Sequence, residues 1–171
     1  IRNNNYVLAM GNVIIQQGDS ISVFSDSLVY DGAIREADLY GNVILLKGNQ
    51  KLFTDSLHYD LNTKVATYTS GATLTNDTTQ LSSIRGYYYV NSDEIFFKDS
   101  VVVVDDSFNL RSDTLMFNTF TKTVYFLGPT LITNDSSRIY CEAGFFKTDN
   151  NVAEFQKNAQ YVKGEQKAIA D

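Results

Sequence analysis

Apolar and polar residues alternate along most of this chain, in segments that turn-forming clusters separate about every 14 to 15 residues. The segments are rich in Val, Ile, Leu, Thr, Tyr and Phe, which favour extended strands. No window carries the i, i+3, i+4 spacing of apolar residues that an amphipathic helix needs. The pattern therefore predicts an all-β protein built from about twelve long strands in an antiparallel meander.

A repeat of about 29 residues runs through these segments. Its clearest copies are Ser25–Asp31 and Thr54–Asp60, which both read Ser/Thr-Asp-Ser-Leu-x-Tyr-Asp. Such a period indicates one small unit stacked on itself, so conspicuous side chains can recur as scaffold. Further copies are Ser112–Asn118, Ser83–Tyr87 and Cys141–Phe146, and a glycine keeps the same period at Gly11, Gly41, Gly71 and Gly128.

Each long strand is expected to bend near its middle. Gly41 and Asn42 tolerate positive φ and lie at the centre of one segment. Near Thr54 and Asp55 the alternation slips by one residue, which a bulge must absorb if the apolar face is to stay buried. Bent strands of this kind stack into two facing antiparallel sheets, a taco-shaped β-jellyroll. The expected structural corners are Asp26, Asp55, Asp113, Glu142, Gly11, Gly41, Gly71 and Gly128, with the carboxylates accepting backbone N–H bonds.

The alternation assigns one face of every segment to the interior. Side chains on this inward face are mainly aliphatic, with an aromatic residue once per repeat. The sequence therefore predicts an elongated apolar interior to which every repeat contributes. The residues expected to face inward are Val13, Ile15, Leu28, Tyr30, Leu39, Val43, Leu45, Leu57, Tyr59, Leu74, Tyr87, Val101, Val103, Leu115, Phe117, Leu131 and Phe146.

Three consecutive segments carry a family resemblance. Leu39–Leu45 reads Leu-Tyr-Gly-Asn-Val-Ile-Leu, Leu52–Asp60 reads Leu-Phe-Thr-Asp-Ser-Leu-His-Tyr-Asp, and Thr63–Ala66 closes the unit. These segments resemble the OstA-like family, the lipopolysaccharide-transport β-jellyroll proteins of the LptA type, which share a fold with LptC and the N-terminal domain of LptD. The Ser/Thr-Asp-Ser/Thr-Leu variant is similar to that of the Bacteroidetes branch.

The resemblance implies a protein without enzymatic activity that carries lipopolysaccharide through the periplasm, its acyl chains lying between the two apolar sheets. The inward residues would then be the lipid-binding residues. Its partners would be like β-jellyroll domains, which join end to end by strand addition to form a bridge. The sequence departs from the family pattern at Ile84–Gly86 and at Ala143–Gly144, so a narrower groove is expected there.

The resemblance covers almost the whole chain, so residues 1–171 are expected to form one domain. The chain starts at Ile1, and its last residues, from Lys163, read as a turn and the opening of another strand. We therefore expect this domain to belong to a longer chain whose signal peptide lies outside it. No apolar run approaches the roughly 20 residues of a transmembrane helix.

Charge and composition argue against several classes of function. The 14 Lys+Arg against 20 Asp+Glu give a net charge of −6 without a basic run, which disfavours nucleic acid as a partner. His58 is the only histidine and Cys141 the only cysteine, so no His-based metal site or Ser-His-Asp triad can be assembled. Asp26, Asp55 and Asp113 recur at one repeat position, which fits scaffold better than a single active site. We expect no catalytic residue, metal or cofactor.

The sequence leaves one alternative open. A secreted or surface β-repeat protein that binds or processes polysaccharide would have a filled core, and its function would depend on outer aromatic and acidic residues. An open cleft along the stack would favour the carrier instead. The net negative charge opposes binding of an anionic lipid unless lysines such as Lys47, Lys51 and Lys98, or bridging divalent ions, compensate for it.

Overall fold

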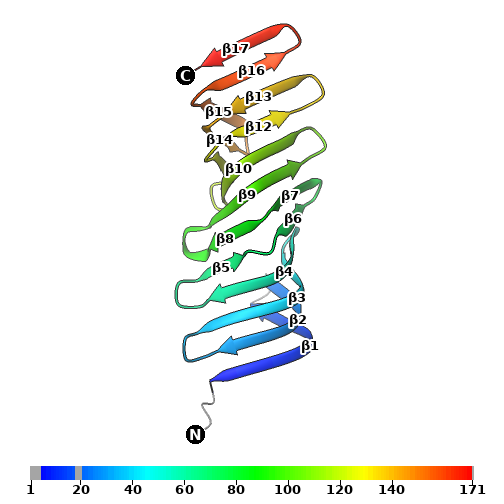
Figure 1. The fold of residues 1–171 in the computed structure, drawn as a ribbon, viewed down its shortest axis with the longest axis vertical. Helices are drawn as coiled ribbons and strands as arrows, with labels where there is room; N and C mark the ends of the chain where they lie inside the picture. The colour runs from blue at the N-terminus through cyan, green and yellow to red at the C-terminus, as the bar shows by residue number, and fades with distance from the viewer. Residues whose placement is uncertain (1–4, 18–20, 171) are drawn as a thin grey trace.

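The chain folds into an elongated stack of antiparallel strands, with the N-terminus at one end and the C-terminus at the other (Figure 1). This computed structural model describes residues 5–17 and 21–170. Over these residues the structure contains 17 strands in one sheet and a single-turn 3₁₀ helix, η1 (Val90–Ser92), but no α-helix. The predicted all-β antiparallel class is confirmed.

Most strands are long and bent, and many are interrupted at the bend. Where a strand is interrupted, two labelled strands follow each other along one line. Counting each such pair once gives eleven long strands, and the short β17 brings the number to the twelve that the turn spacing predicts. The continuous strands are β1 (Tyr6–Gln17), β2 (Ile21–Asp31), β3 (Glu36–Lys47), β4 (Gln50–Asp60), β9 (Glu94–Val104) and β10 (Asn109–Asn118); the interrupted ones are β5 (Val65–Tyr68) with β6 (Ala72–Asn76), β7 (Thr79–Ser83) with β8 (Arg85–Tyr89), β11 (Thr123–Phe126) with β12 (Thr130–Thr133), β13 (Ser137–Cys141) with β14 (Ala143–Lys147), and β15 (Val152–Gln156) with β16 (Ala159–Lys163); β17 (Gln166–Ala170) ends the stack.

The bends divide the sheet into two halves. The C-terminal part of β4 pairs with β5, whereas its N-terminal part pairs with β6. We call the half that contains β5, β8, β11, β14 and β15 half-sheet A, and the half that contains β6, β7, β12, β13, β16 and β17 half-sheet B. One core cluster contains Phe97 and Leu115 from half-sheet A together with Val103 and Leu110 from half-sheet B. The two halves therefore face and pack against each other.

The line of bends, which we call the spine, is made by backbone that leaves the strand conformation. Gly41 and Asn42 have φ of 74° and 47°, and the pairing between β3 and β4 shifts register there. Gly11 and Gly71 also have positive φ. Gly128 lies in the break between β11 and β12 without positive φ, since the following Pro129 restricts it to extended conformations.

Buried hydroxyl groups line the inner side of the spine. Each hydroxyl oxygen lies 3.1 to 3.2 Å from the carbonyl oxygen two residues further on. The serine hydroxyls donate to this carbonyl, whereas Thr54 donates to the closer Gly71 carbonyl at 2.7 Å, so each hydroxyl inside the bend has a partner. In the fifth repeat a cysteine with 0% exposure takes this place. The sequence signal for this ladder is the Ser, Thr or Cys at the first position of each repeat copy. Its members are Ser25, Thr54, Ser83, Ser112 and, as the thiol, Cys141.

The corner carboxylates have different contacts from those predicted. Asp26 accepts a hydrogen bond from the Asn42 side-chain amide at 2.8 Å, and Glu142 accepts one from the Tyr140 hydroxyl at 3.1 Å. Over residues 5–17 and 21–170 no backbone N–H donates to the carboxylates of Asp26, Asp55, Asp113 or Glu142, so that expectation is wrong. The reason is that spine N–H groups bond to carbonyls of the next strand, as Asp113 N–H does to Pro129 at 3.3 Å.

We expect Ser112→Ala to lower the free energy of unfolding by about 1–3 kcal/mol, because Ser112 is buried and its hydroxyl bonds the Thr114 carbonyl and lies 2.8 Å from that of Thr130. The neighbouring change Asp113→Ala, on an exposed side chain, should cost no more than about 0.5 kcal/mol. Urea denaturation of the two variants checks the difference. Equal losses of stability would contradict the structural role of the hydroxyl ladder.

Burial raises the pKa of the Cys141 thiol from 9.0 to about 11. Between these two pH values the unfolded chain loses the thiol proton while the folded chain keeps it. The folded state therefore loses stability as the pH rises through this window, by up to about 3 kcal/mol, and the full stability is present below pH 9. Denaturation from pH 8 to pH 11 should show a smaller decline for Cys141→Ala than for the wild type. An equal decline of stability with pH in the wild type and in Cys141→Ala would refute the contribution of the thiol.

Candidate functional site

Four rows of side chains line the space between the half-sheets, which we call the slot. Each row crosses successive strands through register partners, so it runs along the stack. The mouth row of half-sheet B is wholly aliphatic as far as β13, and the mouth row of half-sheet A alternates aromatic and smaller residues. The first row contains Ile15, Val23, Leu45, Leu52, Leu74, Leu81, Val103, Leu110, Ile132 and Ile139, and the second contains Tyr30, Ala37, Tyr59, Ala66, Tyr88, Ile95, Phe117, Val124 and Phe146.

Two deeper rows lie next to the spine. In half-sheet B the deep row is made of small residues and the buried hydroxyls, from Val13 and Ser25 to Thr130 and Cys141. In half-sheet A it is made of larger residues except at two glycines: Leu28, Leu39, Leu57, Tyr68, Gly86, Phe97, Leu115, Phe126, Gly144 and Phe155.

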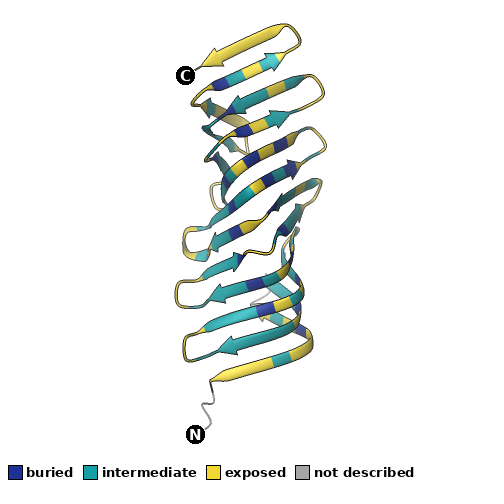
Figure 2. Ribbon diagram, in the orientation of Figure 1, coloured by how far each residue is buried: buried dark blue, intermediate teal, exposed yellow. Residues whose placement is uncertain are grey.

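Burial falls from the spine to the mouth. Val43, Val101 and Leu115 in the deep rows are almost fully buried, whereas most residues of the mouth rows are only half-buried (Figure 2). A closed core would bury both kinds of row. The protein's own side chains therefore leave the apolar mouth of the slot partly open to solvent.

The residues expected to face inward lie in these four rows, with two exceptions. Tyr87 pairs with Thr67 and Phe96 on the outer face, and the inward aromatic of this repeat is Tyr88. The 29-residue repeat explains why Tyr88 faces inward, because Tyr88, and not Tyr87, lies one repeat after the inward Tyr59. The expectation for Tyr87 is wrong by one residue.

Leu131 is the second exception. It is 40% exposed and pairs with Arg111 and Tyr140 on the outer face. Its neighbour Ile132 takes the inward place beside Leu110, because Ile132 is the residue that follows Val103 by one repeat. The one-residue shift again places the side chain on the opposite face.

A tyrosine fills the slot at the third repeat, where the sequence has Gly86 in place of a leucine. A Cβ atom at Gly86 would lie 2.2 Å from the Tyr68 ring, so the ring occupies the room that the missing side chain leaves. Tyr68 is only 5% exposed, and its hydroxyl lies 2.6 Å from Ser83 Oγ. Because Ser83 donates to the Arg85 carbonyl, the Tyr68 hydroxyl is the donor to Ser83. Burial raises the pKa of Tyr68 to about 12.

In the fifth repeat two aromatic rings lie beside Gly144, although here the backbone of β15, and not a ring, takes the place that a Cβ atom would need. Its register partners Phe126 and Phe155 stack across it, with ring centroids 6.0 Å apart and an angle of 11° between the ring planes. A Cβ atom at Gly144 would lie 2.2 Å from the Glu154 carbonyl oxygen. Aromatic rings from neighbouring strands thus fill the slot at both places where the repeat lacks its leucine.

One lysine reaches across the mouth of the slot. Lys47, at the end of β3 in half-sheet B, donates a hydrogen bond of 3.2 Å to the hydroxyl of Tyr88 in half-sheet A. Its ammonium also lies 5.4 Å from the centre of the Tyr88 ring. Lys51 and Lys98, which the sequence pattern offers beside Lys47, lie next to the inward residues Leu52 and Phe97 and therefore have the outward parity of their strands.

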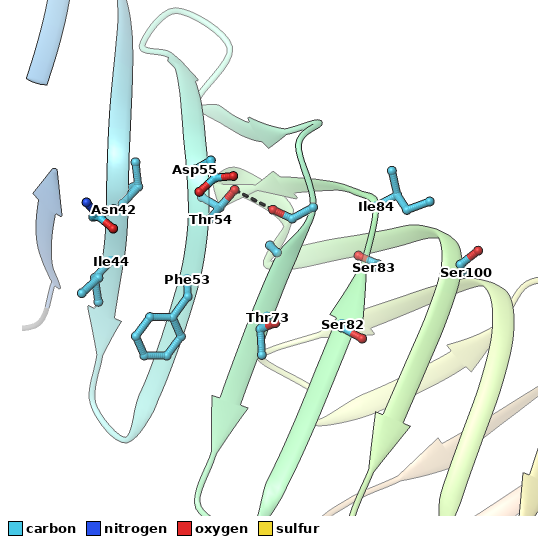
Figure 3. Close-up of a pocket in the computed structure, with 13 residues that line it drawn as sticks. Asn42, Ile44, Phe53, Thr54, Asp55, Thr73, Ser82, Ser83, Ile84 and Ser100 are labelled. Carbon is cyan, nitrogen blue, oxygen red and sulfur yellow. Dashed lines mark hydrogen bonds between the residues drawn. The ribbon is translucent and has the colours of Figure 1, made fainter. Parts of the chain in front are cut away.

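The outer face carries a shallow open hollow of about 570 Å³ beside the spine (Figure 3). Ile44, Phe53, Thr73 and Ser82 line it, with Thr54 at its back donating a hydrogen bond of 2.7 Å to the Gly71 carbonyl. Its lining holds one carboxylate and no histidine, so it offers no acid-base pair.

The remaining candidate groups are separate from the slot. His58 Nδ1 lies 2.8 Å from Asp38 Oδ1 on the outer face, and both side chains are partly exposed. Within the residues that the structure describes, no three His, Cys, Asp or Glu side chains are grouped as metal ligands would be. Over the same residues there is no helix of the length and apolarity needed to cross a membrane.

Comparisons with known proteins point to one family. The family model described as OstA-like protein matches residues 1–113. Among solved structures, the chain is similar to LptH from Pseudomonas aeruginosa, described as the LptA homologous periplasmic component of the conserved lipopolysaccharide transport device. The TM-score is 0.51 at 20% identity, over 58% of this chain and 76% of LptH, so this likeness shows the fold. No curated protein matches the chain.

Proposed function

The chain belongs to the OstA-like protein family, and on this premise we propose that it is a non-enzymatic periplasmic module that carries lipopolysaccharide, with the acyl chains held in the slot. The observation that supports this function best is the half-buried aliphatic mouth row of half-sheet B. A continuous apolar row that stays partly exposed is costly in water, and an acyl chain can cover it.

The slot can bind such chains without specific polar contacts. Each methylene that leaves water contributes about 0.8 kcal/mol, so a long chain gains several kcal/mol from the aliphatic row alone. At the N-terminal end of the stack the row is formed by Ile15, Val23, Leu45 and Leu52, which are all half-buried. Binding through burial of apolar surface, without specific hydrogen bonds, suits a carrier that must later release its ligand.

Charge at the mouth supports an anionic ligand in spite of the net charge of −6. Lys47 places its ammonium at the opening of the slot. Its partner there is the neutral hydroxyl of Tyr88, and no carboxylate of the residues that the structure describes forms an ion pair with it. A phosphate group of the lipid is a stronger partner for that ammonium than a phenol is.

The two ends of the stack support end-to-end association with like domains. Among residues 5–17 and 21–170, β1 pairs with β2 alone and β17 with β16 alone, so each presents an open edge of backbone donors and acceptors. Apolar side chains accompany these edges: Met10 is 76% exposed and Ile169 is 63% exposed. Addition of a strand from another domain would satisfy the edge and cover these side chains.

The polysaccharide alternative has less support. It requires paired carboxylates or aromatic platforms on the outer face. The repeat carboxylates Asp26, Asp55 and Asp113 are exposed and belong to separate repeats along the spine, and the outer hollow contains Asp55 as its one carboxylate. We therefore retain the carrier as the proposed function.

Leu45→Glu should reduce lipopolysaccharide binding at least about tenfold, because a carboxylate in the mouth row must be desolvated or protonated beside the acyl chain. The matched control is Leu46→Glu, one residue along β3, since Leu46 pairs with Ser22 and Lys51 on the outer face. Native mass spectrometry after incubation with lipopolysaccharide measures both, and circular dichroism verifies folding. Unchanged binding by folded Leu45→Glu would refute the carrier.

The protein should form oligomers whose length rises with concentration in sedimentation velocity, because its end strands are open. Proline at Ala168, in the middle of β17, should shorten them while the melting temperature changes little, since proline disrupts the edge ladder. A strictly monomeric wild type at high concentration would exclude the bridge but not lipid binding.

A further inference from the structure

A row of apolar side chains, mostly aromatic, crosses the outer face of half-sheet A, on the side away from the slot. Register partners on five successive strands form this row, so it runs along the stack for about 19 Å at about 4.8 Å per strand. All five side chains are half-buried, which leaves part of each open to solvent. We call this row the outer strip, and its members are Tyr87, Phe96, Met116, Tyr125 and Phe145.

The outer strip departs from the pattern on the rest of its face. The solvent side of an antiparallel sheet normally carries polar side chains. The same row follows this rule before the strip, at Asp38, His58 and Thr67, and again after it, at Glu154. A solvent-facing row that becomes aromatic over five strands indicates a binding surface.

The strip is one side chain wide, which limits what it can bind. The rows on either side lie two residues away along each strand, or about 7 Å, and are mainly polar. An interface with a globular protein has a broader apolar centre. The strip therefore fits a linear ligand. Its polar neighbours are Arg85, Lys98 and Thr114 on the side of the spine, and Glu94, Asn118 and Lys147 on the side of the mouth.

Among linear ligands, a chain of sugar rings fits best. An extended peptide joins a sheet by main-chain bonds at a free edge, but every strand under the strip already has a partner on both sides. An acyl chain finds a more continuous apolar surface in the slot. A sugar ring can stack its C–H face on an aromatic ring while its hydroxyls bond polar groups on both sides.

The position of the strip makes it accessible from the mouth of the slot. Each member lies two residues from the end of its strand at the mouth, as Phe96 does in β9 and Met116 in β10. A saccharide that leaves the mouth over half-sheet A therefore reaches the strip after about 7 Å. On the inner side of the same strands Phe97, Leu115 and Phe126 are buried in the core, which gives the strip a rigid support.

We propose that the outer strip binds the saccharide portion of lipopolysaccharide, and that it favours a saccharide with anionic substituents. This inference rests on the proposed function. Lys98 and Lys147 flank the strip on opposite sides, and within residues 5–17 and 21–170 neither forms an ion pair, so both are suited to phosphate or carboxylate groups. The described flanking rows contain one carboxylate, that of Glu94, whereas cleavage of a polysaccharide requires a pair. The strip therefore binds a saccharide without processing it.

The test is calorimetric titration of the whole protein with lipid-free oligosaccharide, released from lipopolysaccharide by mild acid. Tyr125→Ser should lower the affinity at least about fivefold, because it removes a ring on which a sugar stacks. The matched control is Tyr40→Ser, since Tyr40 is 48% exposed on the outer face of half-sheet A but lies outside the strip. Met116→Tyr should raise the affinity about threefold, because it adds a ring between Phe96 and Tyr125.

The outcomes separate this proposal from the carrier. If the wild type binds lipopolysaccharide but no oligosaccharide, or if Tyr125→Ser and Tyr40→Ser bind the oligosaccharide equally, the strip is refuted and the carrier stands. Where Tyr125→Ser does not fold, an unchanged affinity of Met116→Tyr refutes the strip. Equal affinity for a neutral dextran oligomer refutes the preference for anionic substituents. Binding of the oligosaccharide without binding of lipopolysaccharide refutes the carrier and favours the polysaccharide alternative.

Discussion

Covalent continuity between the two half-sheets is the constraint on which this structure depends. Almost every long strand passes through the spine from one half to the other, so the halves are joined along one edge over the length of the stack. Neither half can bury its apolar face except against the other. The backbone must bend at each crossing, and the pairs Gly41-Asn42 and Asp99-Ser100 do so with consecutive positive φ angles.

The open mouth follows from the same constraint. Since the halves are joined only at the spine, their separation there is fixed by the backbone and by small side chains such as Val43, Ala72 and Ser83. At the other edge only side-chain contacts hold them, of which the Lys47–Tyr88 pair is one. The gradient of burial from spine to mouth thus arises from the topology and needs no special residue.

Much of the fold could be predicted from the sequence because its period repeats the same physical signals. Turn spacing gives the twelve strands, and Gly11 and Gly41 mark bends where positive φ is needed. The equivalent bends at Asp99-Ser100 and Lys157-Asn158 lack glycine, so the signal that marks the other bends is weaker there. Tertiary pairing selects positive φ there in spite of the side chains.

The interior was harder to predict, since it depends on neighbours in other strands. The errors at Tyr87 and Leu131 came from assigning a face within one segment, and strict use of the 29-residue period would have selected Tyr88 and Ile132. Tyr68 lies outside the repeated motif, and its place follows only from the pairing of β5 with β8. The available signal was glycine at the leucine position of two repeats.

The glycines and the rings that cover them also bear on how such a stack can change in length. Gly86 depends on Tyr68 of the strand before it, and Gly144 on Phe126 and Phe155 on either side. A repeat transplanted alone could place a glycine next to a strand that lacks the aromatic ring, and a void would remain. It could also place the ring next to a leucine, and the two side chains would then compete for the same space. The exchangeable unit of this chain is therefore larger than its 29-residue repeat, and duplication or loss is tolerated only where a glycine and its aromatic neighbour move together.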